Sequence, residues 1–419
     1  MQTLYVQYEG QLVGLLNRNQ ENIFSFAYDQ NWLEHPQSFP ICLVMPLTEE
    51  TFGHKVTLAF FENLLPEGYV RDEIERSGRE SGVFQLLKKY GKDCAGAISV
   101  SPELLSPNST GEDDLVHVET EKIDTAIHQK RGVAELMTKE EWGYLSLAGA
   151  QDKFACIFKN NKFYIPQNGA PTTHIVKVPI WRNNIYESVL NEYFCMTLAK
   201  NIGLNTANVH IFTANNPMLI VERYDRDFPK KGSIKRLHQQ DFCQAQGVWS
   251  EEKYEDKGGP TLQDNYNLIV ENIRARKKLA NAEDFLDWIS FNLIIGNNDG
   301  HSKNLSLLLK DGIELAPFYD LISTAVYPAL NPNFSFKLAG RSKADKIGIN
   351  QMNEVETQLS IKPNTFVERF LTIAKSVRDE MSPLSERVLK EHPDSKVIPQ
   401  IQKLIEKRLK GFAKQGLKA

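Results

Sequence analysis

The stretch FLDWISFNLIIGNNDGHSKN, residues 285–304, joins a strongly apolar segment to a cluster of polar residues. The apolar part predicts a buried helix that ends at Gly296, because glycine is common just past a helix C-terminus. The polar part, GNNDGHSKN at 296–304, places an aspartate, a histidine, a lysine and an asparagine directly after that helix. Asn-Asp-Gly alone is typical of an ordinary surface turn. A buried helix seldom ends in so polar a segment for packing reasons, so the context favours a functional loop.

A predicted β-hairpin follows this loop and carries a second acidic residue. LSLLLK at 305–310 and IELAPFYD at 313–320 are apolar segments joined by Asp-Gly, a strong turn signal. The hairpin ends at Asp320 and so brings a second carboxylate toward Asp299. Taken alone, Asp320 would be interpreted as the N-cap of the next helix.

The spacing of these polar residues indicates a chemistry. Asp299 and Asn304 are five positions apart, as are the base and the magnesium-binding asparagine of the protein-kinase catalytic loop. Asp320 then stands where the metal-binding aspartate would. Mg²⁺ prefers hard oxygen ligands, which Asn304 and Asp320 supply, whereas Asp299 can accept a hydroxyl proton. The pattern predicts phosphoryl transfer that uses ATP and Mg²⁺.

Two charged residues upstream are candidates for holding the ATP phosphates. Lys177 lies within HIVKVP, a predicted strand in which apolar and β-branched neighbours favour an ion pair or a phosphate as its partner. Glu192, on the following predicted helix, would pair with Lys177 as the kinase strand lysine pairs with its helix glutamate. The alternatives are a lysine on the solvent face of a sheet and a glutamate on an exposed helical face.

Two further segments fit the same interpretation. SLAGAQDK at 146–153 precedes a strand, and its small residues would let backbone amides approach a phosphate closely. Those small residues are equally explained by close packing of neighbouring backbone. VERYDR at 221–226 stands where a kinase places the hinge that binds adenine, although its charges are also consistent with a solvated salt-bridge cluster.

Composition limits the class of protein. The chain has 419 residues, 41% hydrophobic and 24% charged, and a formal net charge of -4, so global charge does not hold it to nucleic acid. We expect no membrane segment, no secretory signal and a cytoplasmic location. The five cysteines form no CxxC pair and predict reduced core thiols. No zinc motif is present, so any metal should have oxygen ligands.

The order of predicted elements suggests several domains. Residues 4–28 alternate apolar and polar residues, which predicts antiparallel strands. A polar, acidic segment from about residue 102 to 130 marks a domain boundary. Strands and one helix follow as far as residue 225, with Asn160 and Asn161 at the turn of a predicted hairpin, and the remainder is mostly helical. Closing helices are expected at residues 363–381, where the proline opens the helix, and at residues 396–414. The sequence therefore predicts an α+β protein.

Taken in order, SLAGAQDK, TTHIVKVP, NEYFCMTLAK, VERYDR, GNNDGHSKN and LAPFYDLIST resemble the signature series of the HipA-type serine/threonine kinase toxins of type II toxin-antitoxin systems. ENLLPEG and KDCAGAIS extend the resemblance to the long form with its own N-terminal subdomain. It implies a protein-kinase-like two-lobed fold with antiparallel sheets in the N-terminal lobe. Its parts would be an N-terminal subdomain at 1–105, a kinase N-lobe at 106–225 and a helical C-lobe at 226–419.

The resemblance also implies roles for individual residues. Asp299 would be the catalytic base with His301 beside it, and Asn304 and Asp320 would bind magnesium. Ser146 would be an autophosphorylation site that silences the kinase by expelling the phosphate loop. The residues that contact ATP would be Ala148, Gly149, Ala150, Gln151, Lys153, Lys177, Glu192, Glu222, Arg223, Tyr224, His301, Asn304 and Asp320.

Partners are implied by the family alone. The expected protein substrate is an aminoacyl-tRNA synthetase, specifically glutamyl-tRNA synthetase, whose modification would inhibit translation and promote growth arrest and persistence. A HipB-like helix-turn-helix antitoxin would neutralise the toxin and supply most contacts to operator DNA. Two rival hypotheses are a catalytically idle co-repressor and a small-molecule phosphotransferase. The intact Asp299, Asn304 and Asp320 favour the kinase over the first, and the N-terminal module counts against the second.

Overall fold

The computed structural model of the chain separates into two compact units. Unit 1 comprises Met1–Val178, Phe212–Ser250 and Leu307–Asp311, and unit 2 comprises Pro179–Ile211, Glu251–Ser306 and Gly312–Ala419. The residues that the structure describes are 1–78, 81–105, 115–129, 133, 151–167, 169–181, 184–229 and 233–418. The three-part division based on the sequence stays a prediction.

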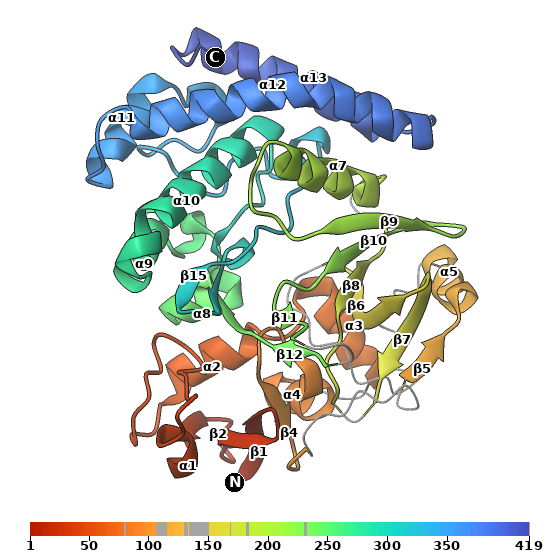
Figure 1. Ribbon diagram of the computed structural model, residues 1–419, viewed down its shortest axis with the longest axis vertical. Coiled ribbons are helices and arrows are strands. Elements are labelled where there is room, and N and C mark those ends of the chain that lie inside the picture. The colour runs from red at the N-terminus through yellow and green to blue at the C-terminus, as the bar shows by residue number, and fades with distance from the viewer. Residues whose placement is uncertain are drawn as a thin grey trace. The chain divides into compact units, whose positions relative to one another are not determined.

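The alternating N-terminal sequence forms an antiparallel sheet in unit 1 (Figure 1). Its strands are β1 (Gln2–Tyr8), β2 (Gln11–Arg18), β3 (Phe24–Tyr28) and β4 (Ser99–Ser101), in the order β3-β2-β1-β4. Leu4, Val6 and Tyr8 of β1 are buried, as a period of two requires when one face of a sheet packs on the core. Gly10, at φ 82, allows the tight turn into β2.

A second, six-stranded sheet carries the predicted lysine strand. Its strands are β5 (Leu115–Val118), β6 (Lys153–Lys159), β7 (Lys162–Pro166), β8 (His174–Lys177), β9 (Val209–Thr213) and β10 (Pro217–Glu222). The order is β5-β7-β6-β8-β10-β9. Asn160 and Asn161, both with positive φ, form the turn between β6 and β7, as the sequence predicts. Strand β8 is therefore central, with antiparallel neighbours on both sides.

One hydrophobic core underlies both sheets of unit 1. It runs from Leu4 in β1 through Trp32 and Phe61 to Phe154 in β6 and Ile220 in β10. Helices and short strands complete the unit: α1 (Gln30–Leu33), α2 (His54–Glu62), α3 (Gly68–Gly78), α4 (Val83–Tyr90), α5 (Thr120–His128), β11 (Arg226–Asp227), β12 (Lys235–Arg236), β13 (His238–Asp241) and α8 (Phe242–Gln246). All five cysteines of the chain are buried free thiols, as expected.

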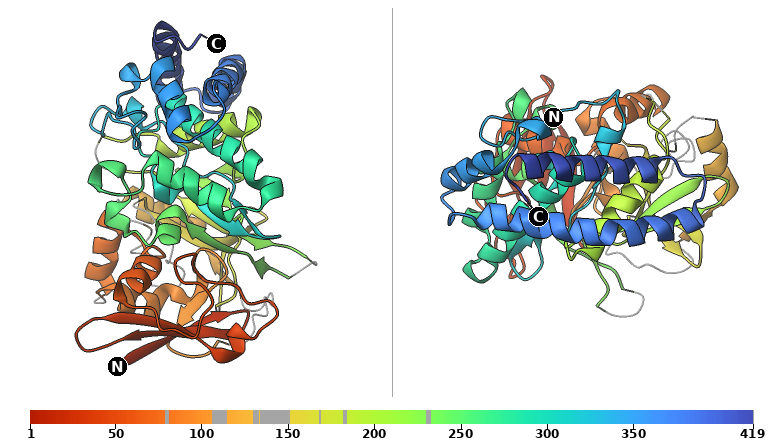
Figure 2. Two further views of the ribbon diagram at one scale, coloured as in Figure 1. Left: turned by 90° about the vertical axis from the view of Figure 1, so that its left-hand side faces the viewer. Right: turned by 90° about the horizontal axis from the view of Figure 1, so that it is seen from above.

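Unit 2 is mostly helical. Its helices are α7 (Ser188–Asn201), α9 (Leu262–Asn272), α10 (Ala275–Ile295), α11 (Ile349–Gln358), α12 (Thr365–Glu391) and α13 (Val397–Lys414). The long helices α12 and α13 lie side by side, as both views in Figure 2 show. Every residue of α10 from Phe285 to Ile295 is buried, and Gly296 ends the helix at φ 75. The predicted buried helix and its glycine cap are confirmed.

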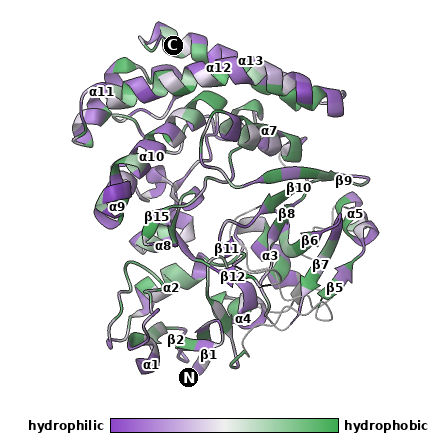
Figure 3. Cartoon of the chain, in the orientation of Figure 1, coloured by the Kyte–Doolittle hydropathy of each residue, from purple (hydrophilic) through white to green (hydrophobic). Residues whose placement is uncertain are grey.

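Helix α12 differs from the prediction. The sequence suggested a helix from Pro363 to Met381, but α12 begins at Thr365 and continues past Pro383 to Glu391. Leu384 and Val388 remain buried beyond the proline, so the apolar face outweighs the loss of one backbone hydrogen bond. Figure 3 shows hydrophobic and hydrophilic residues alternating along this helix. Among the described helices, none has the length and apolar character to span a membrane.

Candidate active site

The loop after α10 is held in shape by its own asparagines. The Asn297 side-chain oxygen accepts from the Asp299 amide at 3.1 Å, and the Asn304 side-chain amide donates to the Asp299 carbonyl at 3.1 Å. The His301 amide donates to the same carbonyl at 3.0 Å. The Asp299 side chain is exposed, whereas Asn297, His301 and Asn304 are buried. The structure thus brings Asp299 and Asn304 together and leaves the carboxylate accessible.

Asp320 is joined to this loop through Asn297. The Asn297 side-chain amide donates to the Asp320 carbonyl at 3.4 Å and to the Asn292 side chain at 2.7 Å. Asp320 has a left-handed backbone, with φ 55, which costs a non-glycine residue about 1 kcal/mol and is common at functional sites. It caps no helix, because the following 3-10 helix (Thr324–Val326) has Ser323 as its N-cap. The N-cap interpretation of Asp320 is therefore wrong.

The hairpin before Asp320 forms as predicted. Strands β14 (Ser306–Leu309) and β15 (Ile313–Leu315) flank the Asp-Gly turn, and the Ala316 amide donates to the Ser306 carbonyl at 2.8 Å. Beyond it, Phe318 exchanges main-chain hydrogen bonds with Asn205 and Ala207. These bonds fix the chain that leads into Asp320.

Further hydrogen bonds connect the loop to the segment after Asp320. The Asn298 amide donates to the Thr324 hydroxyl at 2.8 Å, and the Ser335 hydroxyl donates to the Asn298 carbonyl at 2.7 Å. The Ser323 amide donates to the Asn191 side chain at 2.8 Å. Buried and mutually bonded groups of this kind hold the proposed base and metal ligands in one arrangement.

Sequence reasoning missed two members of this site. Asn297 lies inside the quoted motif but had no role assigned to it. Tyr254 lies 45 positions before Asp299, and its hydroxyl donates to Asp299 Oδ1 at 2.5 Å. Its ring also meets His301 edge-on, with centroids 4.9 Å apart. The several asparagines in the loop were a signal for Asn297, whereas no local sequence pattern pointed to Tyr254.

Unit 1 holds the lysines predicted to bind phosphate. Lys177 is 5% exposed at the end of β8, where it stands directly opposite Lys153 on β6. Residues opposite each other on antiparallel strands share one face, so two cations are placed side by side. Gln151, just before β6, donates its side-chain amide to the Val178 carbonyl at 3.3 Å.

The predicted hinge alternates between exposed and buried side chains. Glu222 at the end of β10 is exposed, and the partly buried Tyr224 donates its hydroxyl to Gln239. Arg223 and Asp225 are buried, and the Arg223 guanidinium donates to Asp225 at 2.9 and 2.8 Å. The charges of VERYDR therefore do not form the solvated cluster that was the alternative interpretation.

These charges belong to a buried cluster with Asp93 of the KDCAGAIS segment. Its carboxylate pairs with Arg223 at 3.1 Å, Arg226 at 2.8 Å and Arg236 at 3.0 Å. The Thr172 hydroxyl also donates to it at 2.6 Å. Burial by itself raises the pKa of Asp93, but the three guanidinium groups outweigh it and hold that pKa well below its usual range. Asp93 is therefore ionised in the folded protein.

The remaining predicted residues are placed as follows. Glu192 is 2% exposed in α7 of unit 2, and its pairing with Lys177 of unit 1 stays a prediction. Ser146, Ala148, Gly149 and Ala150 lie outside the described residues.

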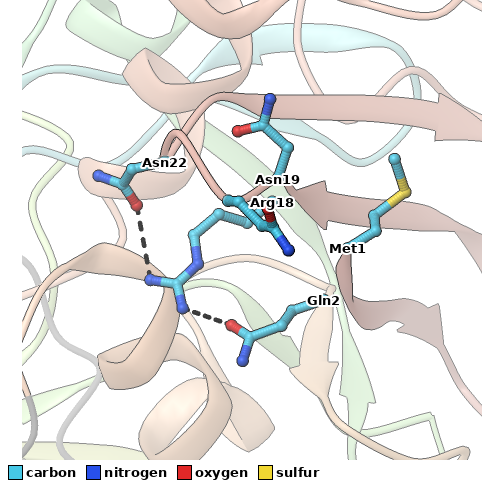
Figure 4. Close-up of a pocket in the computed structure, with 6 residues that line it drawn as sticks. Met1, Gln2, Arg18, Asn19 and Asn22 are labelled. Atoms are coloured by element: carbon cyan, nitrogen blue, oxygen red, sulfur yellow. Dashed lines mark hydrogen bonds between the residues drawn. The ribbon is translucent and has the colours of Figure 1, made fainter.

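A surface hollow of about 420 Å³ lies at the edge of the N-terminal sheet (Figure 4). Within it Arg18 donates to Gln2 and, at 3.5 Å, to Asn22, while its guanidinium lies 4.6 Å from the Phe84 ring centroid. The lining residues are Met1, Gln2, Arg18, Asn19, Gln20 and Asn22. None of the predicted site residues lines this hollow.

Comparison with known proteins identifies the family. Residues 145–381 match the HipA-like C-terminal domain, and residues 4–101 match the HipA N-terminal domain. The chain belongs to the HipA family. It is thus a serine/threonine protein kinase of the HipA toxin type with an α+β, kinase-like fold, as the sequence predicts. Membership implies the use of ATP with a metal ion.

Individual HipA-family proteins resemble it along most of their length. The putative kinase Y4mE of Sinorhizobium fredii is 37% identical over 349 residues, which cover 81% of this chain and 82% of that protein. The serine/threonine-protein kinase toxin HipA of Shewanella oneidensis is 29% identical over 371 residues, with 84% and 82% covered. A solved complex of Shewanella oneidensis HipA, HipB and operator DNA matches with a TM-score of 0.80 and 25% identity, covering 98% of this chain and 97% of that one.

Proposed function

We propose that Asp299 is the base of this kinase and that Asn304 and Asp320 hold Mg²⁺. The observation that carries this assignment is the hydrogen-bonded group in which Asn297 contacts Asp299 and Asp320 and Asn304 contacts Asp299. Because the amide nitrogen of Asn304 donates to Asp299, its side-chain oxygen is the atom left to bind a cation. That oxygen and the Asp320 carboxylate form the hard donor set that Mg²⁺ prefers.

In this assignment each residue of the loop has one task. The exposed Asp299 carboxylate accepts the proton of the acceptor serine or threonine hydroxyl as that oxygen attacks. His301 lies beside Asp299, on the side of the site where the acceptor hydroxyl would bind. When bound, Mg²⁺ neutralises charge that develops on the transferred phosphoryl group. The loop hydrogen bonds keep Asp299 and Asn304 in place, which lowers the reorganisation needed for transfer.

The family resemblance supplies the residues of unit 1 that we propose to bind ATP. Lys177 and Lys153 would bind the phosphates, together with Gln151 and the loop Ala148, Gly149 and Ala150. Glu192 would orient Lys177. Glu222 and Tyr224 would contact adenine, whereas the Arg223 side chain is engaged with Asp93 and Asp225. Arg223 would therefore contribute to nucleotide binding through its main chain.

The relatives and the family resemblance support a proposal for the biological role. Shewanella oneidensis HipA is named as a kinase toxin and was solved with HipB and operator DNA. We expect this chain to phosphorylate an aminoacyl-tRNA synthetase, glutamyl-tRNA synthetase by resemblance, and so to inhibit translation and promote growth arrest and persistence. A HipB-like helix-turn-helix protein would neutralise it, and phosphate on Ser146 would silence it.

The decisive experiment measures phosphate transfer with purified variants. Wild-type chain, labelled ATP and magnesium are added to a cell lysate, and modified proteins are identified by mass spectrometry. Asp299→Asn should lower transfer at least about 100-fold while nucleotide affinity is kept. Asp320→Ala should abolish transfer and also weaken magnesium-ATP binding. Asp379→Asn, an exposed acid on α12, is the matched control and should behave as wild type.

The same samples test the rival hypotheses and the regulation. Phosphate on Ser146 should be found in wild type and be absent from Asp299→Asn, and the isolated phospho-form should bind ATP more weakly. Label only in small molecules would favour the small-molecule phosphotransferase. Full activity of either Asp299→Asn or Asp320→Ala would refute the assignment of that residue, and no label anywhere would favour the idle co-repressor.

A further inference from the structure

The proposed base already has a hydroxyl bound to it. Tyr254 donates its phenolic proton to Asp299 Oδ1 at 2.5 Å, so a neutral hydroxyl is hydrogen-bonded to the carboxylate. An acceptor serine or threonine must donate its own hydroxyl proton to this carboxylate if Asp299 is the base. The tyrosine and the substrate therefore require the same group.

A short structured loop holds Tyr254 in this position. The Tyr254 carbonyl accepts from the Lys257 and Gly259 amides, both at 3.0 Å, and closes a tight turn. Gly259 has no room for a side chain, because a Cβ there would lie 1.7 Å from the Glu252 carbonyl oxygen. Glu255 accepts from the Lys337 amide at 2.8 Å. The tyrosine is thus placed on Asp299 by its own turn and by an anchor on the following residue.

The contact is also easy to release. Asp299 is exposed and Tyr254 is only partly buried, so water can replace the phenol on the carboxylate. A hydrogen bond that exchanges with water contributes much less to stability than it would in a dry interior. Residues Glu251, Glu252 and Asp256 around Tyr254 are exposed, and the two 3-10 turns, Ser250–Glu252 and Glu255–Lys257, have few buried side chains. Displacement of the phenol therefore requires no disruption of a hydrophobic core.

We propose that the Tyr254 hydroxyl occupies the acceptor-hydroxyl position on Asp299 and acts as a gate that an incoming serine or threonine must displace. This inference rests on the proposed role of Asp299 as the base. The edge-on contact of the Tyr254 ring with His301 sets the direction of approach, since His301 lines the same position. Water can displace the phenol only transiently, because a water molecule makes few other contacts at the site, whereas a protein segment gains further contacts as it displaces Tyr254. The gate therefore limits transfer to water and favours a protein acceptor.

The test uses ATP hydrolysis by the full-length chain, in which water is the acceptor and ADP and phosphate are the products. Tyr254→Phe keeps the ring and removes only the hydroxyl, so hydrolysis should rise by up to about tenfold, the size expected of one ordinary hydrogen bond that exchanges with water. Tyr69→Phe is the matched control, because the exposed Tyr69 also donates to a carboxylate, Glu73, at 3.1 Å. It should leave hydrolysis unchanged.

The outcomes separate this inference from the assignment of the base. The Tyr254→Phe/Asp299→Asn double variant should not show the increase in ATP hydrolysis expected of Tyr254→Phe alone. Thermal unfolding should show that every variant is folded. A Tyr254→Phe rate equal to or below wild type would overturn the gate, because a residue that merely positions Asp299 gives a loss. Full activity of Asp299→Asn would instead refute the base. With a protein acceptor, Tyr254→Phe should lower the KM for that protein more than it changes kcat.

Discussion

Arg226 donates to Asp93 at 2.8 Å, and both side chains are fully buried in unit 1. The two residues are 133 positions apart, one at the end of the predicted hinge segment and the other in the KDCAGAIS segment of the N-terminal module. The Gly96 amide of that segment donates to Asp225 at 2.7 Å as well. The N-terminal module and the hinge segment are therefore joined by buried charges as well as by the shared hydrophobic core.

Asp93→Asn is expected to destabilise the protein strongly. The substitution removes the carboxylate that pairs with three arginines, and these arginines remain buried away from water. They are Arg223, Arg226 and Arg236. Breaking a buried ion pair on one side typically costs roughly 3–5 kcal/mol. Urea unfolding followed by circular dichroism measures the change. The exposed Asp72→Asn in α3 is the control, and equal midpoints for both variants would contradict the role given to the cluster.

His238 should make the stability of the folded chain depend on pH. Burial lowers its pKa from the usual 6.5 to about 4, and its Nε2 contacts the Ile41 carbonyl at 2.9 Å. Between these pKa values the unfolded chain binds a proton that the folded chain does not. The contribution of His238 to the free energy of unfolding should therefore be fully present above pH 6.5. It should be lost as the pH falls, and the free energy of unfolding should decrease by about 3 kcal/mol toward pH 4.

Urea unfolding at several pH values checks this contribution. His238→Gln, which keeps an amide donor for Ile41 but does not titrate, should flatten the slope between pH 6.5 and 4. His128→Gln replaces an exposed histidine at the end of α5 and should keep the slope. Parallel curves for wild type and His238→Gln would show that another group is responsible.

Asn297→Ala is expected to reduce both activity and stability. The change removes the acceptor of the Asp299 amide and the donor to the Asp320 carbonyl, and Asn297 is fully buried. Lost partners of buried polar groups cost roughly 1–3 kcal/mol. Phosphate transfer should fall at least about tenfold, with most of the loss in kcat. Asn353→Ala on the exposed face of α11 provides the comparison, and an unchanged kcat for Asn297→Ala would rule out its positioning role.

The isolated chain should bind operator DNA weakly. Its net charge is -4, so affinity in the non-specific range of about 10⁻⁴ to 10⁻⁶ M is expected without a helix-turn-helix partner. Exposed lysines at 403, 407, 410 and 414 repeat along one face of α13 and would add phosphate contacts in a partner complex.

Gel-shift titrations at several salt concentrations, with and without the partner, measure both effects. Replacing two of these α13 lysines with alanine should weaken the salt dependence of DNA binding by the complex. The slope of log affinity against log salt concentration should become shallower by about one unit per lost phosphate contact. Tight, sequence-specific binding by the chain alone would contradict this prediction and favour the co-repressor hypothesis.

Much of the candidate site was predictable because its members are close in the sequence. The apolar run, Gly296 and the spacing of Asp299 and Asn304 are local features, and the structure has the helix, the cap and the loop contact that they indicate. The hairpin that leads to Asp320 was equally visible in its turn sequence. The end of α12 was not, because a proline normally stops a helix unless packing beyond it continues.

The sequence by itself determined the kinase-like order of elements and the family, and it predicted the residues of the candidate catalytic loop, since these depend on short-range patterns and on motif identity. Only the tertiary structure decided that Arg223 and Arg226 turn inward to Asp93, and that Tyr254 donates a hydrogen bond to Asp299. Such contacts join residues far apart along the chain, and hydrophobic periodicity carries no information about which distant polar groups will meet. They are set by how the elements pack, because a buried charge or a short hydrogen bond forms only where packing brings its partner within reach.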